Sequence, residues 1–196
     1  MQSKFWYEKS NQDLQKELDN FLEASSAGNS EIVRNFLGSN VIINFFSLEV
    51  VEGFVNKTPL QRYKDLALIF SAQQGHVEIM KMLVDHGADV NANYFENYPP
   101  ALYQTIMQNK AEAFNYLIRV DTIDLNLSSM GNSLPILLAA FNNRLEMVKA
   151  LVEKGVDPNS ANGQGWTAQS LAAQKGHQQI VEYLNSLLSA TKGSGM

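Results

Sequence analysis

Three histidines are the side chains of this sequence best suited to acid–base or metal chemistry, because the chain contains no cysteine. His76 and His86 fall at opposite ends of one expected helix, and His177 lies in another part of the chain. No pair therefore has the spacing of metal ligands on a shared face. Without cysteine the chain also forms no disulfide and no thiolate nucleophile. We predict no metal, no cofactor and no catalytic residue.

Two short motifs match catalytic or nucleotide-binding patterns by spacing alone. Residues 163–168, GQGWTA, fit the G-x-G-x-x-A that cradles a pyrophosphate, but no strand precedes them. Residues 189–192 fit S-x-x-K, whose serine needs a buried environment that a chain end does not provide. Glu78, Glu112 and Glu146 recur at one repeat position. This pattern is typical of a solvated helix face rather than of paired catalytic carboxylates.

The composition is that of an ordinary folded protein. Of the 196 residues, 45% are hydrophobic and 18% are charged, and this length can bury a continuous core. The net charge of −5 leaves no basic surplus to neutralise phosphates, so we expect neither nucleic acid nor a membrane as a partner. The N-terminus lacks the apolar core of a secretory signal, which favours a cytoplasmic protein. An effector exported on a non-cleaved signal would have the same pattern.

The chain is organised as a repeat. The residues that end the first helix of each unit fall in register at Gly28, Gly75, Asn109, Asn143 and Gly176, with steps of 47, 34, 34 and 33. A period near 33 residues predicts stacked supersecondary units. After each register residue, apolar side chains recur at i, i+3, i+4 and i+7. Each unit therefore contributes an amphipathic helix with one buried stripe.

Turn residues follow these amphipathic helices. Gly87 and Gly155 can adopt the left-handed conformation that stops a helix, and an Asp or Asn just afterwards can bond its own backbone in the turn. A shorter helix precedes each register residue and is clearest at 167–177. There we expect Thr167 to cap the helix and the small Ala172 to let neighbouring helices approach closely.

These features resemble the ankyrin repeat, a β-turn followed by two antiparallel helices with the motifs T-P-L-H-x-A and G-A-D-V-N. Residues 75–91 and 162–177 are close to this pattern, and the fourth unit keeps part of it. The unit around Asn109 departs most, with PALYQT at 100–105 in place of the first motif. The resemblance implies an all-α ankyrin-repeat solenoid over residues 13–188, with about five repeats including two caps.

The remaining segments lie at the chain ends and between the first two units. We expect residues 1–12 to form a tail or a lid, and residues 189–196 to form a disordered tail. The 47-residue step carries about fourteen extra residues, an insertion at about 45–65. We expect the second part of it to extend the next helix backwards, so that this helix runs from Pro59 through Ala72. The apolar stretch 45–55 either packs under that helix or contacts a partner.

The resemblance also implies a binding surface, because turn tips and first-helix ends of ankyrin repeats line one concave side. Carried over onto this sequence, these positions hold aromatic residues, methionines and amides, a composition typical of interface hot spots. The predicted partner-binding residues are Tyr94, Phe95, Tyr98, Met107, Met130, Phe141, Trp166, Gln73 and Gln174.

The implied function is non-enzymatic binding of another protein by a monomer. The more specific version of this prediction is that the chain acts as an inhibitor or an effector. The alternative is an enzyme or a small-molecule sensor that uses a pocket near the 45–65 insertion. A polar pocket there with strongly shifted pKa values would favour the alternative. A dry, filled one would favour the binding module.

Overall fold

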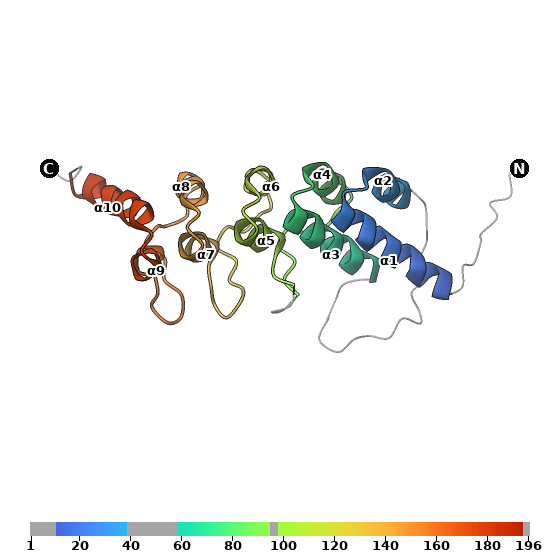
Figure 1. Cartoon of the computed structure of the whole chain (residues 1–196), viewed down its shortest axis with the longest axis horizontal. Helices are drawn as coiled ribbons and strands as arrows, with labels where there is room; N and C mark the ends of the chain where they lie inside the picture. Colours follow the sequence, from blue (N-terminus) through green and yellow to red (C-terminus); the bar gives the residue numbers. More distant parts are fainter. Residues whose placement is uncertain (1–10, 39–58, 95–97, 194–196) are drawn as a thin grey trace, which may run out of the picture.

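The computed structural model describes residues 11–38, 59–94 and 98–193, and this part of the chain consists of helices, loops and three isolated β-bridges. The helices form pairs that stack in one row, with each first helix in one layer and each second helix in the other (Figure 1). The first helices are α1 (Asn11–Ala27), α3 (Pro59–Gln74), α5 (Ala101–Met107), α7 (Pro135–Phe141) and α9 (Ala168–Lys175). The second helices are α2 (Ser30–Gly38), α4 (Val77–Asp85), α6 (Ala111–Leu117), α8 (Leu145–Glu153) and α10 (Gln178–Gly193). The expected all-α solenoid of five helix pairs is confirmed.

A single hydrophobic core runs along the stack, from Phe21 in α1 to Leu184 in α10. Each first helix packs on the first helix of the next repeat, and each second helix packs against its own first helix. Ala139 and Ala172 are fully buried where α7 meets α9, which is the close approach expected of small residues. The second helices bury only one stripe, for example Leu83 in α4.

Gly87 and Gly155 have the predicted left-handed backbone, with φ angles of +81° and +90°. The residues that end the first helices, at the positions expected from the repeat register, have it as well. Their φ angles are +83° at Gly28, +85° at Gly75, +54° at Asn109, +58° at Asn143 and +73° at Gly176. A left-handed residue interrupts the helical hydrogen-bond pattern, so the chain reverses into the second helix. At Gly28 space is also limited, because an added Cβ would lie 2.8 Å from Cε1 of the His76 ring.

The predicted local turn and cap interactions are present. The Thr167 side chain accepts a hydrogen bond from the Ser170 backbone N–H at 3.2 Å and caps α9. Asp89, Asp124 and Asp157 each accept a hydrogen bond from the backbone N–H two residues ahead, at 2.9, 2.8 and 2.9 Å. These bonds close the turns that follow the second helices.

Helix α3 begins at Pro59, as expected, and ends at Gln74 rather than at Ala72. Two side chains of its additional N-terminal turns hold the end of the neighbouring second helix. Gln61 Nε2 donates to the Gly87 carbonyl at 2.7 Å, and Lys64 Nζ donates to the His86 carbonyl at 2.8 Å. The apolar stretch 45–55 and residues 1–10 of the expected tail or lid lie outside the described residues, and residues 11–12 of it begin α1.

The C-terminal boundary differs from the expected one. Helix α10 begins at Gln178 and continues to Gly193, so residues 189–193 are helical and do not belong to a disordered tail. The physical reason is local, because the segment 178–192 contains neither Pro nor Gly and nothing in it stops a helix.

Candidate functional site

The three histidines bind backbone carbonyls at helix ends, which is their expected structural role. His76 Nε2 lies 2.9 Å from the Ser26 carbonyl oxygen near the end of α1, and His177 Nε2 lies 3.0 Å from that of Phe141 at the end of α7. His86 Nδ1 lies 2.7 Å from the Met82 carbonyl oxygen. The contacts of His76 and His177 satisfy carbonyls that the end of a helix leaves without a helical partner, whereas the Met82 carbonyl also accepts the backbone N–H of His86 at 3.1 Å.

Arg144 serves the same purpose between the third and fourth repeats. It follows the left-handed Asn143, as His76 follows Gly75 and His177 follows Gly176. Its guanidinium donates to the Ile106 carbonyl at 3.3 Å and to the Met107 carbonyl at 3.4 Å. A cation at this point also interacts favourably with the carboxyl end of α5. The side chain that follows each of these turns therefore fixes the first-helix end of the preceding repeat.

Four of the predicted partner-binding residues are the exposed large apolar side chains of the described part of the chain. Their exposed fractions are 41% for Tyr98, 42% for Met130, 42% for Phe141 and 40% for Trp166. Tyr98, Met130 and Trp166 lie on the loops that precede α5, α7 and α9, and Phe141 ends α7. These side chains are therefore accessible to a partner, and their role in binding stays a prediction.

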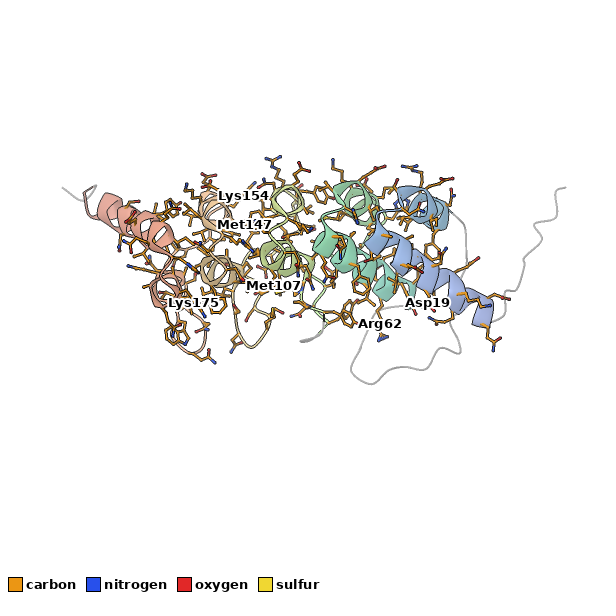
Figure 2. The ribbon with its side chains drawn as sticks, viewed as in Figure 1. Asp19, Arg62, Met107, Met147, Lys154 and Lys175 are labelled. Atoms are coloured by element: carbon orange, nitrogen blue, oxygen red, sulfur yellow. The ribbon has the colours of Figure 1, made fainter. Side chains whose placement is uncertain are left out.

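Three other predicted residues lie at or near the ends of first helices. Met107 ends α5 and is half-buried, in the first-helix layer that also carries Lys175 (Figure 2). Gln73, near the end of α3, is half-buried, and Gln174, near the end of α9, is exposed. Phe95 lies outside the described residues.

Tyr94 was expected at an exposed turn tip, and the structure corrects this. Its side chain is only 7% exposed, and its hydroxyl donates to Oδ2 of the fully buried Asp65 at 2.7 Å. Asp65 also accepts bonds from Gln61 Nε2 at 2.8 Å and from the Asp89 N–H at 2.7 Å. Burial first, and then the bond to Asp65, raise the pKa of the Tyr94 phenol far above its usual value. Tyr94 anchors its loop on α3 and is not available to a partner.

Tyr103 positions the next loop, and the sequence analysis did not single it out. It is fully buried, and its hydroxyl oxygen lies 2.6 Å from the Ser133 carbonyl oxygen and 2.8 Å from that of Leu127. Burial is the main cause that raises the pKa of this phenol. The available signal was its position in PALYQT, where Tyr103 aligns with the His of T-P-L-H-x-A. Through these bonds Tyr103 holds the loop that displays Met130.

The loop that displays Trp166 is closed by its own residues. Asn162 Oδ1 accepts hydrogen bonds from the Trp166 N–H at 2.9 Å and the Gln164 N–H at 3.1 Å. The Asn162 N–H in turn donates to the Trp166 carbonyl at 3.0 Å. The indole is thus exposed on a loop whose backbone is already ordered, which lowers the entropic cost of binding.

Two of the exposed rings have neighbours that orient them. Lys175 Nζ lies 4.3 Å from the centroid of the Phe141 ring, in a cation–π contact between the fourth and fifth repeats. The rings of Tyr98 and Phe70 meet edge to face, with their centroids 5.7 Å apart. Both contacts cross from one repeat to its neighbour, so the orientation of these rings depends on the stacking.

The described residues hold no group of three or more His, Asp or Glu side chains that could bind a metal ion. Within the same residues, every buried side-chain nitrogen and oxygen has a hydrogen-bond partner. None of the described helices is long and apolar enough to cross a membrane.

Known proteins with similar sequences carry the same repeat. The chain matches the family described as ankyrin repeats (3 copies) over residues 12–129 and again over 102–192. It is 32% identical over 100 residues to Notch-regulated ankyrin repeat-containing protein A of Danio rerio, a match that covers 49% of this chain and 89% of the relative.

Two spider toxins match a larger share of the chain. Alpha-latrotoxin-Lg1a of Latrodectus geometricus is 30% identical over 115 residues, 58% of this chain and 8% of the toxin. Alpha-latrocrustotoxin-Lt1a of Latrodectus tredecimguttatus is 30% identical over 145 residues, 71% of this chain and 10% of the toxin. The chain thus spans about a tenth of the length of these toxins. Together with the stacked helix pairs, the family match over almost the whole chain shows that this protein belongs to the ankyrin-repeat family.

Proposed function

We propose that this chain binds another protein, without catalysis, through one continuous surface of its loops and first-helix ends. We call it the finger surface; it consists of Gln73, Tyr98, Met107, Met130, Phe141, Trp166 and Gln174. Ankyrin repeats are generally protein–protein interaction modules, which supports the class of function. The partner, and an action as an inhibitor or an effector that covers a functional site of that partner, belong to the proposal.

The observation that carries the proposal is the location of the exposed apolar side chains. All four large ones in the described part of the chain belong to the finger surface. Aromatic residues and methionine are enriched where proteins bind one another, and a few such residues usually supply most of the binding free energy. Trp166 also lies on a pre-ordered loop, which favours a binding role over a packing role.

The proposal is tested by removing two rings of the finger surface. The intact chain is used to isolate a partner, and its affinity is then measured for Trp166→Ala and Phe141→Ala. Each change is expected to weaken binding by about 2 kcal/mol or more, mainly through faster dissociation. Each is expected to lower the free energy of unfolding by less than about 1.5 kcal/mol, since both side chains are already partly exposed.

Lys154→Ala is the matched control, because Lys154 is exposed on the second-helix layer (Figure 2). It is expected to leave both affinity and stability unchanged. An unaltered affinity in both ring variants, together with a large loss of stability, would show that the rings serve packing and that the finger surface is not the contact. The 45–65 insertion would then become the leading candidate.

A further inference from the structure

The charged side chains of the last three repeats are unevenly distributed between the two halves of each repeat. The loops and first helices of these repeats comprise residues 92–109, 126–143 and 159–176. Their described residues carry one charged side chain, Lys175, and Glu96 lies outside the described residues. The second-helix halves differ sharply. Residues 110–125 hold five charged side chains and residues 144–158 hold six, while residues 177–193 of the last repeat hold two.

The uncharged half is nevertheless polar at its exposed positions. Its exposed hydrogen-bonding side chains are mostly amides, among them Asn93, Gln108, Asn132, Gln164 and Gln174. These neutral donors and acceptors surround the exposed rings and methionine of the finger surface. The chain as a whole has a net charge of −5, so the lack of charge here is a property of this face and not of the protein.

A surface with so few charges selects against charged partners. A partner carboxylate or ammonium buried on it would lose its water and find no opposite charge, which is costly. The surface also has too few cations to attract phosphate groups, and its field cannot steer a charged partner during association. Two cations of the described residues lie at this surface, and both already have a contact: Lys175 lies over the Phe141 ring, and the Arg144 guanidinium binds the Ile106 and Met107 carbonyls.

From this distribution we infer that the finger surface recognises an uncharged protein segment, whose apolar side chains and neutral hydrogen-bonding groups match its rings and amides. The inference rests on the proposed function and adds the chemistry of the partner to it. Partner carboxylates take part only opposite Lys175 and Arg144, the two cations already engaged at this surface. Binding is therefore nearly independent of ionic strength. Its specificity comes from rejecting charged partners rather than from forming ion pairs with them.

The first test uses a displayed library of random peptides of about 16 residues, long enough as a helix to span the three stacked first helices. The intact chain is used for selection at about 50 mM and about 500 mM NaCl. The selected peptides are expected to be depleted in Asp, Glu, Lys and Arg, to be the same at both salt concentrations, and to be lost with Trp166→Ala. If the peptides that require Trp166 are instead enriched in acidic or basic residues, the inference is overturned. The proposed function would remain intact.

The second test introduces charge of either sign and measures affinity for the best selected peptide. Gln174→Glu and Gln174→Lys place opposite charges on the finger surface, and both are expected to weaken binding about tenfold or more, because either charge is buried against an uncharged segment. Gln179→Glu and Gln179→Lys are the matched controls, since Gln179 is an exposed glutamine of the same repeat on α10. They are expected to change affinity less than about twofold.

The outcomes separate two kinds of failure. If one charge at Gln174 weakens binding and the other strengthens it, the bound segment is charged and the inference is wrong. If no peptide requires Trp166 or Phe141, or if the purified chain instead pairs with a second copy through this face, the proposed function fails as well. Tight binding of a single-stranded oligonucleotide by the same face would contradict both.

Discussion

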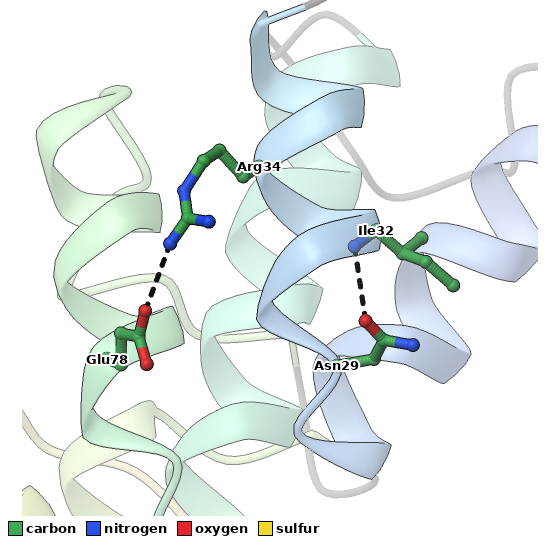
Figure 3. Close-up of polar contacts among 4 residues, drawn as sticks. All are labelled: Asn29, Ile32, Arg34 and Glu78. Carbon is green, nitrogen blue, oxygen red and sulfur yellow. Dashed lines mark hydrogen bonds and ion pairs between the residues drawn. The ribbon is translucent and has the colours of Figure 1, made fainter.

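The two layers of the solenoid are built from the same repeat but present different surfaces. The second helices bury one stripe and expose charged side chains, as in the ion pair between Arg34 of α2 and Glu78 of α4 at 3.1 Å (Figure 3). The first helices inside the stack are enclosed by their neighbours, so that residues 101–106 of α5 are all buried. In α5 and α7 exposed residues are confined to the helix ends and the preceding loops, and there the large apolar side chains are exposed.

This difference separates two tasks within one repeat. The second-helix layer keeps the protein hydrated through charges that are individually weak contributors to stability. The first-helix layer supplies the core, and the ends of its helices display residues that the core does not need. Solubility and recognition can therefore vary separately, because they depend on different positions of the repeat.

The largest effect is expected where a second helix enters the core. Leu151→Ala removes a fully buried side chain of α8 and should lower the free energy of unfolding by about 2–5 kcal/mol. Phe141→Ala, at the exposed end of α7, serves as the comparison and should cost much less. Urea denaturation of both variants measures the difference. Equal losses would mean that the Phe141 ring belongs to the core.

A smaller effect is expected where first helices meet. Ala139→Leu should overpack the interface between α7 and α9 and cost about 1–3 kcal/mol. The matched control is Ala173→Leu, because Ala173 is exposed on α9 and has room for a larger side chain. The denaturation midpoints of the two variants are compared with that of the unaltered chain. An unchanged midpoint for Ala139→Leu would contradict the close approach of the first helices.

The buried tyrosines predict a loss of stability in base. Folding raises the pKa of Tyr94 and Tyr103, so each contributes stability that is fully present below the ordinary tyrosine pKa of about 10 and is lost as the pH rises above it. The expected loss at about pH 11 is about 1 kcal/mol per tyrosine. Denaturation midpoints between about pH 8 and pH 11 measure it.

Tyr103→Phe provides the control for this pH dependence. The variant loses the hydrogen bond to the loop at every pH, but it should also lose part of the decline above about pH 10, because it has no proton to release. A decline as steep as that of the unaltered chain would mean that Tyr103 does not contribute to it.

The smallest effect is expected on the charged layer. Arg34→Ala removes an ion pair whose side chains are 62% and 68% exposed, and should change the free energy of unfolding by less than about 0.5 kcal/mol. Repeating the denaturation at high salt should remove even this difference. A loss comparable to that of Ala139→Leu would show that the charged layer contributes to stability as the core does, which contradicts the division described above.

The correct sequence-based predictions concern short-range features. The left-handed Gly87 and Gly155, the ends of the first helices from Gly28 to Gly176, the Thr167 cap and the start of α3 at Pro59 were all predicted. Each depends on the conformational preference of one residue or on contacts within a single turn, and the 33-residue period places these signals in register. The family and the layered architecture follow from the same signals.

What only the tertiary structure decided is which aromatic residues of the loops face the core and which face solvent. Tyr94 and Tyr98 are separated by three residues and form one β-bridge, yet Tyr94 is buried and Tyr98 is exposed. Tyr94 is held by Asp65, 29 residues earlier, and Tyr103 by Ser133, 30 residues later. The composition of a loop contains no information on such distant partners. Each of these two tyrosines is buried because the stacking of repeats brings a hydrogen-bond acceptor beside its hydroxyl. The sequence by itself therefore determined the repeat, and the stacking determined which aromatic side chains lie on the surface.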